Sequence, residues 1–174
     1  NKILETENDD YVLASDTDSL YVTLDSLVQK VGLTDTDKII EFMDKVCEGK
    51  IQDVIDKCYG EMAEYVNAFQ QKMVMKREVL AEVGIWTSKK HYILNVHNSE
   101  GVQYDEPKLK IMGIEAVRSS TPESCRNALK EAFKIMMNGT EDDVINYIEA
   151  FKTKFKALPT EEVSFPRSVK GLAK

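Results

Sequence analysis

The stretch YVLASDTDSLYVTL, residues 11–24, places two apolar segments on either side of a short polar one. The flanking segments YVLA and SLYVTL are rich in β-branched and aromatic side chains, which favour β-strands. The polar residues SDTD between them are typical of a turn, so the stretch predicts a β-hairpin. Asp16 and Asp18 fall at its tip. Two carboxylates there suit either an ordinary turn or a site for Mg²⁺, which prefers oxygen ligands.

The chain downstream of the hairpin alternates between helical and extended patterns. Apolar residues at helical spacing predict two helices, with Glu48-Gly49 between them as the stop. Three extended segments follow, and then two helices whose starts carry Ser120 and Thr140. These predicted elements are helices over 39–46 and 51–69, strands over 73–81, 89–97 and 102–111, and helices over 120–138 and 140–158. Because strands and helices are segregated, the fold predicted is α+β, with an antiparallel sheet and packed helices followed by a small helical subdomain from residue 113.

Composition and charge limit the classes of protein to which this chain can belong. The 174 residues are 43% hydrophobic, enough for a packed core, and hold no run of 18 apolar residues that would suit a membrane span. The net charge is −7, but it is unevenly distributed. Residues 1–71 carry 16 acidic and 6 basic side chains, whereas residues 72–174 carry 14 acidic and 17 basic ones. This asymmetry is typical of a protein in which the second half of the chain binds an anionic partner. Charged residues on solvated helix faces give similar runs, however.

Four motifs together resemble one family. YVLASDTDSLYV resembles the DTDS signature of family B DNA polymerases, with Ser15 where that family usually has Gly. MKRE (75–78) is similar to the family's Arg-Glu strand, and WTSKKHYILNV (86–96) resembles its KxY strand. EPKLKIMGIEAVRSSTP (106–122) resembles the palm-to-thumb junction of the T4-like phage branch. The motifs follow the family's order, so the resemblance implies a palm portion over 1–112 and a partial, helical thumb over 113–174.

The resemblance implies two-metal nucleotidyl transfer with Mg²⁺. Asp18 would be a ligand bridging both ions, and Asp16 would lie beside the primer end and tune the site. Glu78 would be a third carboxylate acting through water. The residues alone leave two plainer interpretations open: both aspartates as turn residues, and Glu78 as a surface acid paired with Arg77.

The same resemblance implies contacts with primer-template DNA. Lys90 would lie at the minor groove of the primer end, where acceptors recur for every base pair. The supporting contacts implied are to the primer backbone from Lys89 and Tyr92, and to duplex phosphates from Lys108, Lys110 and Arg118. The alternatives are an edge strand protected by lysines and exposed solubilising charges.

Parts of the family's pattern lie outside this sequence. An aspartate motif like DxxSLYP and a lysine helix like KxxxNSxYG are both missing from the 174 residues. We therefore expect a piece of a longer polymerase or one subunit of a split enzyme, inactive alone, with only part of the Mg²⁺ site. The partners implied are primer-template DNA, dNTP, an upstream polymerase half and, through exposed core, further copies of the chain. The location implied is the cytoplasm of an infected bacterial host, without secretion or a membrane. A non-catalytic, polymerase-derived module that binds DNA or a replisome protein is the alternative.

Overall fold

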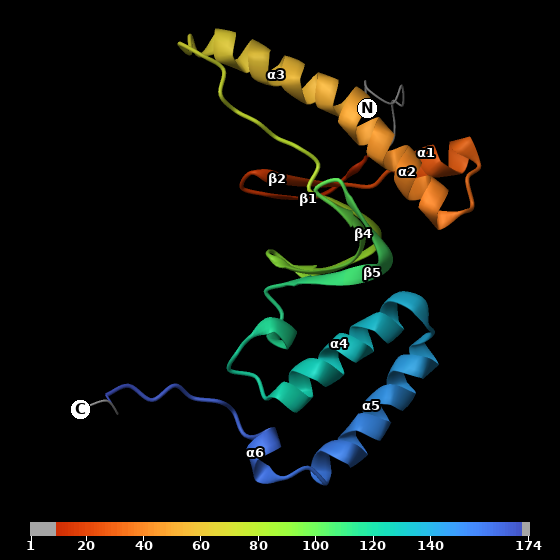
Figure 1. Ribbon diagram of the computed structural model, residues 1–174, viewed down its shortest axis with the longest axis vertical. Helices are drawn as coiled ribbons and strands as arrows, with labels where there is room; N and C mark the ends of the chain where they lie inside the picture. Colours follow the sequence, from red (N-terminus) through yellow and green to blue (C-terminus); the bar gives the residue numbers. More distant parts are fainter. Residues whose placement is uncertain (1–9, 172–174) are drawn as a thin grey trace. The chain divides into compact units, whose positions relative to one another are not determined.

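The computed structural model describes residues 10–171 as a mixed fold of helices and antiparallel sheets, which confirms the α+β prediction (Figure 1). The chain divides into two units. The first comprises Asn1–Leu80 and His97–Glu106, and the second comprises Ala81–Val96 and Pro107–Lys174. Within residues 10–171, no helix combines the length and the apolar character needed to cross a membrane.

The first unit begins with the predicted hairpin. Strand β1 (Val12–Asp16) pairs antiparallel with β2 (Ser19–Val22), so Thr17 and Asp18 form a two-residue turn. The short helix α1 (Asp25–Val31) follows. Its residue Ser26 donates a hydrogen bond of 3.3 Å to the hydroxyl of Tyr11, whose side chain is 7% exposed. The hairpin is thereby fastened to the helix that comes directly after it.

A long helical stretch completes this part of the first unit. Helix α2 (Thr36–Val46) passes through a π-helical turn, η1 (Cys47–Ile51), into α3 (Gln52–Tyr65), as Figure 1 shows. The side chain of Asp35 caps α2 by accepting a hydrogen bond of 3.0 Å from the backbone N–H of Lys38. The predicted stop at Glu48-Gly49 is wrong, because Gly49 lies inside η1 with no left-handed backbone to end the helix.

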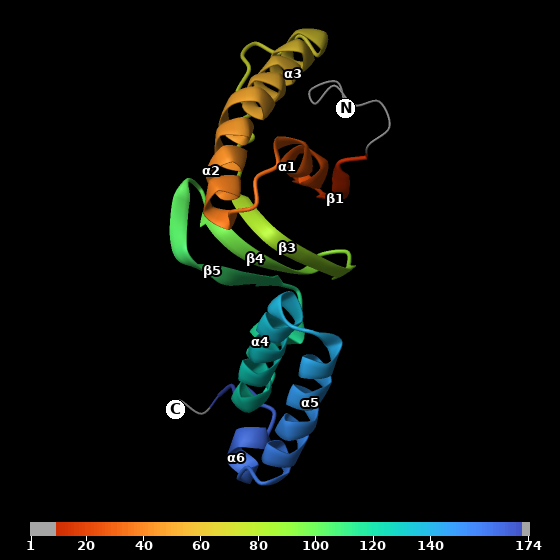
Figure 2. The ribbon, with the colours of Figure 1, turned by 90° about the vertical axis from the view of Figure 1, so that its right-hand side faces the viewer.

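A three-stranded sheet forms in the middle of the chain, in the order β3-β4-β5. Its strands are β3 (Val79–Ser88), β4 (His91–Ser99) and β5 (Val102–Met112), and Figure 2 shows them side by side. The strand predicted over 73–81 begins only at Val79. Pro107 does not interrupt β5, because a sheet edge tolerates a residue without an N–H donor.

The second unit builds its core where β4 and β5 meet the helices that follow. Ile93, Ala116 and Phe133 are almost fully buried there, and the partly buried side chains packed on them are Leu109, Ile111, Ile114, Leu129 and Met137. The helical elements of this unit are the 3₁₀ turn η2 (Glu115–Val117), α4 (Glu123–Asn138), α5 (Glu141–Lys156) and α6 (Thr160–Val163). Helices α4 and α5 pack against each other as a hairpin (Figures 1 and 2).

The helix starts of the second unit test two sequence predictions. Helix α5 begins directly after Thr140 with acidic residues in its first turn, as predicted. Thr140 also caps the helix in a capping box with Asp143, and the hydrogen bonds from Thr140 lower the pKa of the Asp143 carboxyl. Ser120 does not cap α4, because the helix begins only at Glu123, after Pro122, and has no side-chain cap.

Candidate functional site

The DTDS turn presents its two aspartates differently. Asp18 is exposed, whereas Asp16 ends strand β1 and is half-buried. Thr17 between them has a left-handed backbone, with φ of 52°. Two hydrogen bonds stabilise the turn: the Ser19 hydroxyl donates to the backbone oxygen of Asp16 at 3.0 Å, and the Thr17 hydroxyl donates to Asp16 Oδ1 at 3.2 Å. The backbone under Asp18 is therefore fixed while its carboxylate faces solvent.

The donor set of this turn fits a hard cation only in part. Carboxylate oxygens are the ligands that Mg²⁺ prefers, and Asp18 offers them on a tight turn. Among residues 10–171, however, no three His, Cys, Asp or Glu side chains gather closely enough to hold a metal ion. The described part of the chain thus supplies one exposed carboxylate on a tight turn and not a complete coordination shell.

Glu78 lies at the last position before strand β3 and is exposed. Its backbone oxygen accepts a hydrogen bond of 2.7 Å from the N–H of Glu100, in the turn between β4 and β5. The neighbouring Arg77 forms ion pairs with Asp44 and Glu48, two acids of the long helical stretch. The sequence left open a pair between Arg77 and Glu78. In the structure Arg77 pairs with these two other acids.

The charged environment of Arg77 also acts on a cysteine. Burial raises the pKa of the Cys47 thiol above its usual range. The positive charge of Arg77 opposes this shift, whereas the negative charges of Asp44 and Glu48 add to it. A cluster of charges around the nearly buried Arg77 side chain therefore lies next to the segment that carries Glu78.

The KxY residues lie in the second unit, at the turn between β3 and β4. Lys89 and Lys90 form the exposed two-residue turn, and Lys90 has a left-handed backbone with φ of 63°. The His91 ring nitrogen Nδ1 lies 2.9 Å from the backbone oxygen of Lys89. Tyr92 points away from solvent: it is only 7% exposed, and its ring centroid lies 6.3 Å from that of Trp86. The two lysines therefore project from a turn that is flanked by the buried ring of Tyr92 and the half-buried ring of Trp86.

Gly113 packs directly against this turn. Its backbone is left-handed, with φ of 73°, and a Cβ at this position would collide with the backbone oxygen of Lys90. The same Cβ would lie 2.9 Å from Cδ2 of His91. Only glycine meets both the conformational and the spatial demand. The first residue of the predicted thumb is thereby in contact with the KxY turn.

The remaining basic residues predicted to meet DNA lie on β5 and just beyond it. Lys108 is exposed and Lys110 half-buried, and both alternate with the core residues Leu109 and Ile111. Successive strand residues face opposite sides, so the two lysines share the face away from the core. Arg118 lies beyond η2, donates to the backbone oxygen of Gly113 at 3.4 Å and pairs with Glu115 at 3.2 Å.

The predicted residues thus fall into two groups. Asp16, Asp18 and Glu78 belong to the first unit, and the basic group, with Tyr92, belongs to the second. Sequence reasoning missed two contacts, the Arg77 cluster and the packing of Gly113 on the turn. A glycine that directly follows a strand signals a special backbone, which could have pointed to Gly113. Nothing in the pattern around Arg77 marks it as buried.

Comparison with known proteins agrees with the motifs. The family described as Divergent Family B DNA polymerase matches residues 4–153, which is most of the chain. A DNA-directed DNA polymerase of Escherichia phage RB69 is 38% identical over the whole chain, and one of Enterobacteria phage T4 is 33% identical over the whole chain. The alignments cover 20% and 21% of those proteins, so the chain spans about a fifth of the length of these relatives. The chain belongs to the divergent family B DNA polymerases.

Proposed function

We propose that this chain supplies one part of the nucleotidyl-transfer site of a DNA-directed DNA polymerase, with Asp18 as its metal-binding residue. The observation that carries the proposal is the DTDS motif on a tight hairpin turn, with the second aspartate exposed, in a member of this polymerase family. In this proposal residues 1–112 are a palm portion and residues 113–174 a partial thumb.

The chemistry proposed for the turn is electrostatic. Bound Mg²⁺ ions would activate the primer 3′-hydroxyl and neutralise charge on the leaving pyrophosphate. Asp18 would hold the metal through its exposed carboxylate, because the hydrogen bonds under the turn fix its backbone. Asp16 would adjust the field beside the primer end from its half-buried position, and Glu78 would contribute a further carboxylate through water. The rest of the coordination shell would come from outside this chain.

The basic residues are proposed to hold the primer-template. Lys90 would donate to minor-groove acceptors, and Lys89 would contact the primer backbone from the same exposed turn. Tyr92 would support the turn through its buried ring rather than reach the DNA itself. Lys108, Lys110 and Arg118 would meet duplex phosphates, which gives contacts that are sensitive to salt and blind to sequence.

The first test compares the chain alone with the chain mixed with the remaining polymerase half. We expect no primer extension from residues 1–174 alone, because one carboxylate turn cannot hold two Mg²⁺ ions against water. Mixing should give Mg²⁺-dependent extension of a labelled primer. Extension by the pure chain, or DNA binding without extension in the mixture, would contradict the proposal; the second result would favour the non-catalytic binding module.

A second test concerns Lys90. Lys90→Ala should weaken primer-template binding by about tenfold in the reconstituted enzyme, because a charge-assisted hydrogen bond is lost. Binding is measured by fluorescence anisotropy of a labelled primer-template. The matched control is Lys134→Ala on α4, which removes a lysine paired with Glu131 at 2.8 Å. Equal affinities of the Lys90 and Lys134 variants would exclude the primer-end role of Lys90.

A further inference from the structure

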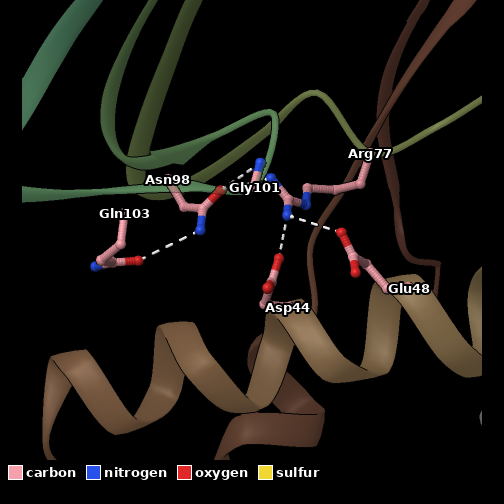
Figure 3. Close-up of polar contacts among 6 residues, drawn as sticks. All are labelled: Asp44, Glu48, Arg77, Asn98, Gly101 and Gln103. Carbon is pink, nitrogen blue, oxygen red and sulfur yellow. Dashed lines mark hydrogen bonds and ion pairs between the residues drawn. The ribbon is translucent and has the colours of Figure 1, made fainter.

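The side chain of Arg77 is the centre of a polar cluster that joins distant parts of the first unit. It is only 9% exposed, and its guanidinium contacts three side chains (Figure 3). Nη2 pairs with Asp44 on α2 and with Oε1 of Glu48 in η1, the latter at 3.5 Å. Nη1 donates to Oδ1 of Asn98 at 2.6 Å. A buried guanidinium needs such partners, so this side chain is held in one place.

Asn98 extends the cluster into the turn between β4 and β5. It is 4% exposed, and its Oδ1 also accepts the N–H of Gly101 at 3.2 Å. Its amide nitrogen donates to Oε1 of Gln103 at 3.4 Å, as Figure 3 shows. Arg77 therefore connects the long helical stretch with this turn through one asparagine.

The same turn also holds the backbone of Glu78. The N–H of Glu100 donates to the Glu78 backbone oxygen at 2.7 Å. Residues 70–78 have no regular helix or strand, so tertiary contacts must fix their course. Glu78 follows Arg77 directly, and both residues are thus bound to the 98–101 turn, one by its side chain and the other by its main chain. A shift of the Arg77 side chain would move the backbone from which the Glu78 carboxylate projects.

We propose that Arg77 is a positioning residue for Glu78, acting by clamping residues 77–78 between Asp44, Glu48 and the β4–β5 turn. The inference rests on the proposed role of Glu78 beside the metal site. It assigns Arg77 no contact with DNA, metal or substrate. The guanidinium suits this task because its two terminal nitrogens reach three acceptors at once, which a lysine ammonium on a flexible stem does not reproduce.

The first experiment measures the clamp in the 174-residue chain, independently of polymerase activity. Hydrogen exchange of the Glu100 amide reports the bond to the Glu78 oxygen. Arg77→Ala should speed this exchange by about tenfold or more, because the buried Asn98 and the half-buried Asp44 both lose the guanidinium as a partner. Asp44→Asn keeps the size of its side chain and should speed it less, which covers the case in which Arg77→Ala does not fold. The control, Lys45→Ala, breaks an exposed pair with Glu41 on the same helix and should leave the exchange unchanged. Unchanged exchange in both cluster variants overturns the proposal.

The second experiment asks whether the clamp acts through Glu78. In the reconstituted enzyme, Glu78→Gln and Arg77→Ala should each raise the Mg²⁺ concentration needed for half-maximal extension, by about tenfold. The double variant should need no more Mg²⁺ than Glu78→Gln alone. Additive effects would overturn the positioning role. If Glu78→Gln itself leaves the Mg²⁺ dependence unchanged, the proposed role of Glu78 fails, whereas the exchange data still decide whether Arg77 holds its backbone.

Discussion

Replacing Asp18 with Asn is expected to abolish Mg²⁺-dependent primer extension by the reconstituted enzyme, lowering the single-turnover rate by about 10³-fold or more. Asparagine keeps the size of the side chain and tolerates a turn, but its neutral amide binds a hard cation far more weakly than a carboxylate. The folded chain should therefore persist, with an unchanged thermal midpoint by circular dichroism. Loss of extension with retained folding is the pattern that a metal-binding residue predicts.

The chain offers a matched control for this substitution. The string Asp-Thr-Asp occurs a second time, at residues 35–37, where Asp35 caps α2 and Asp37 lies in its first turn. Asp37→Asn should cost only about 0.3–1 kcal/mol of stability, through the helix dipole, and leave extension unchanged. Asp16→Asn should slow extension less than Asp18→Asn does. An Asp18→Asn enzyme that extends primers at nearly the original rate would rule out Asp18 as the metal ligand.

The two Asp-Thr-Asp strings show what sequence can predict. Apolar, β-branched segments on both sides of residues 16–18 predict a hairpin, and the structure has one. The second string directly precedes an apolar helical stripe, a position where an aspartate is typical of a helix cap, and Asp35 accepts the Lys38 N–H. Local pattern succeeded in both places because the partners of the turn and of the cap lie within a few residues along the chain.

The local sequence pattern did not predict the structure where contacts between residues distant along the chain determine it. The apolar run Met73-Val74 suggested a strand, but these side chains are 54% and 73% exposed and the described residues around them form no strand before Val79. Arg77 and Asp44 are 33 positions apart along the chain, and no spacing rule connects them. The cluster forms only because tertiary packing brings the helical stretch and the β4–β5 turn to the same side chain. For this reason, the sequence alone did not determine which carboxylate pairs with Arg77.

Gly113→Ala is expected to destabilise the chain and to disturb the KxY turn. A left-handed backbone costs a residue with a Cβ roughly 1–2 kcal/mol. At Gly113 the new methyl group would also meet the Lys90 backbone oxygen and the His91 ring. Backbone cannot move aside as a flexible side chain can, so the turn carrying Lys89 and Lys90 must shift. Primer-template affinity should fall with it, because the proposed donor of Lys90 leaves its position.

A second glycine separates the two causes of this effect. Gly32 has nearly the same backbone, with φ of 71° against 73°, but a Cβ there would meet nothing within 4 Å. Gly32→Ala therefore carries the conformational cost alone, and the difference between the two variants in free energy of unfolding isolates the collision with the turn. Gly113→Ala should unfold at lower denaturant than Gly32→Ala and should weaken DNA binding in the reconstituted enzyme, an effect that disappears when Lys90 is already alanine. Equal destabilisation by the two variants would mean that the turn absorbs the methyl group, and Gly113 would then have no part in positioning Lys90.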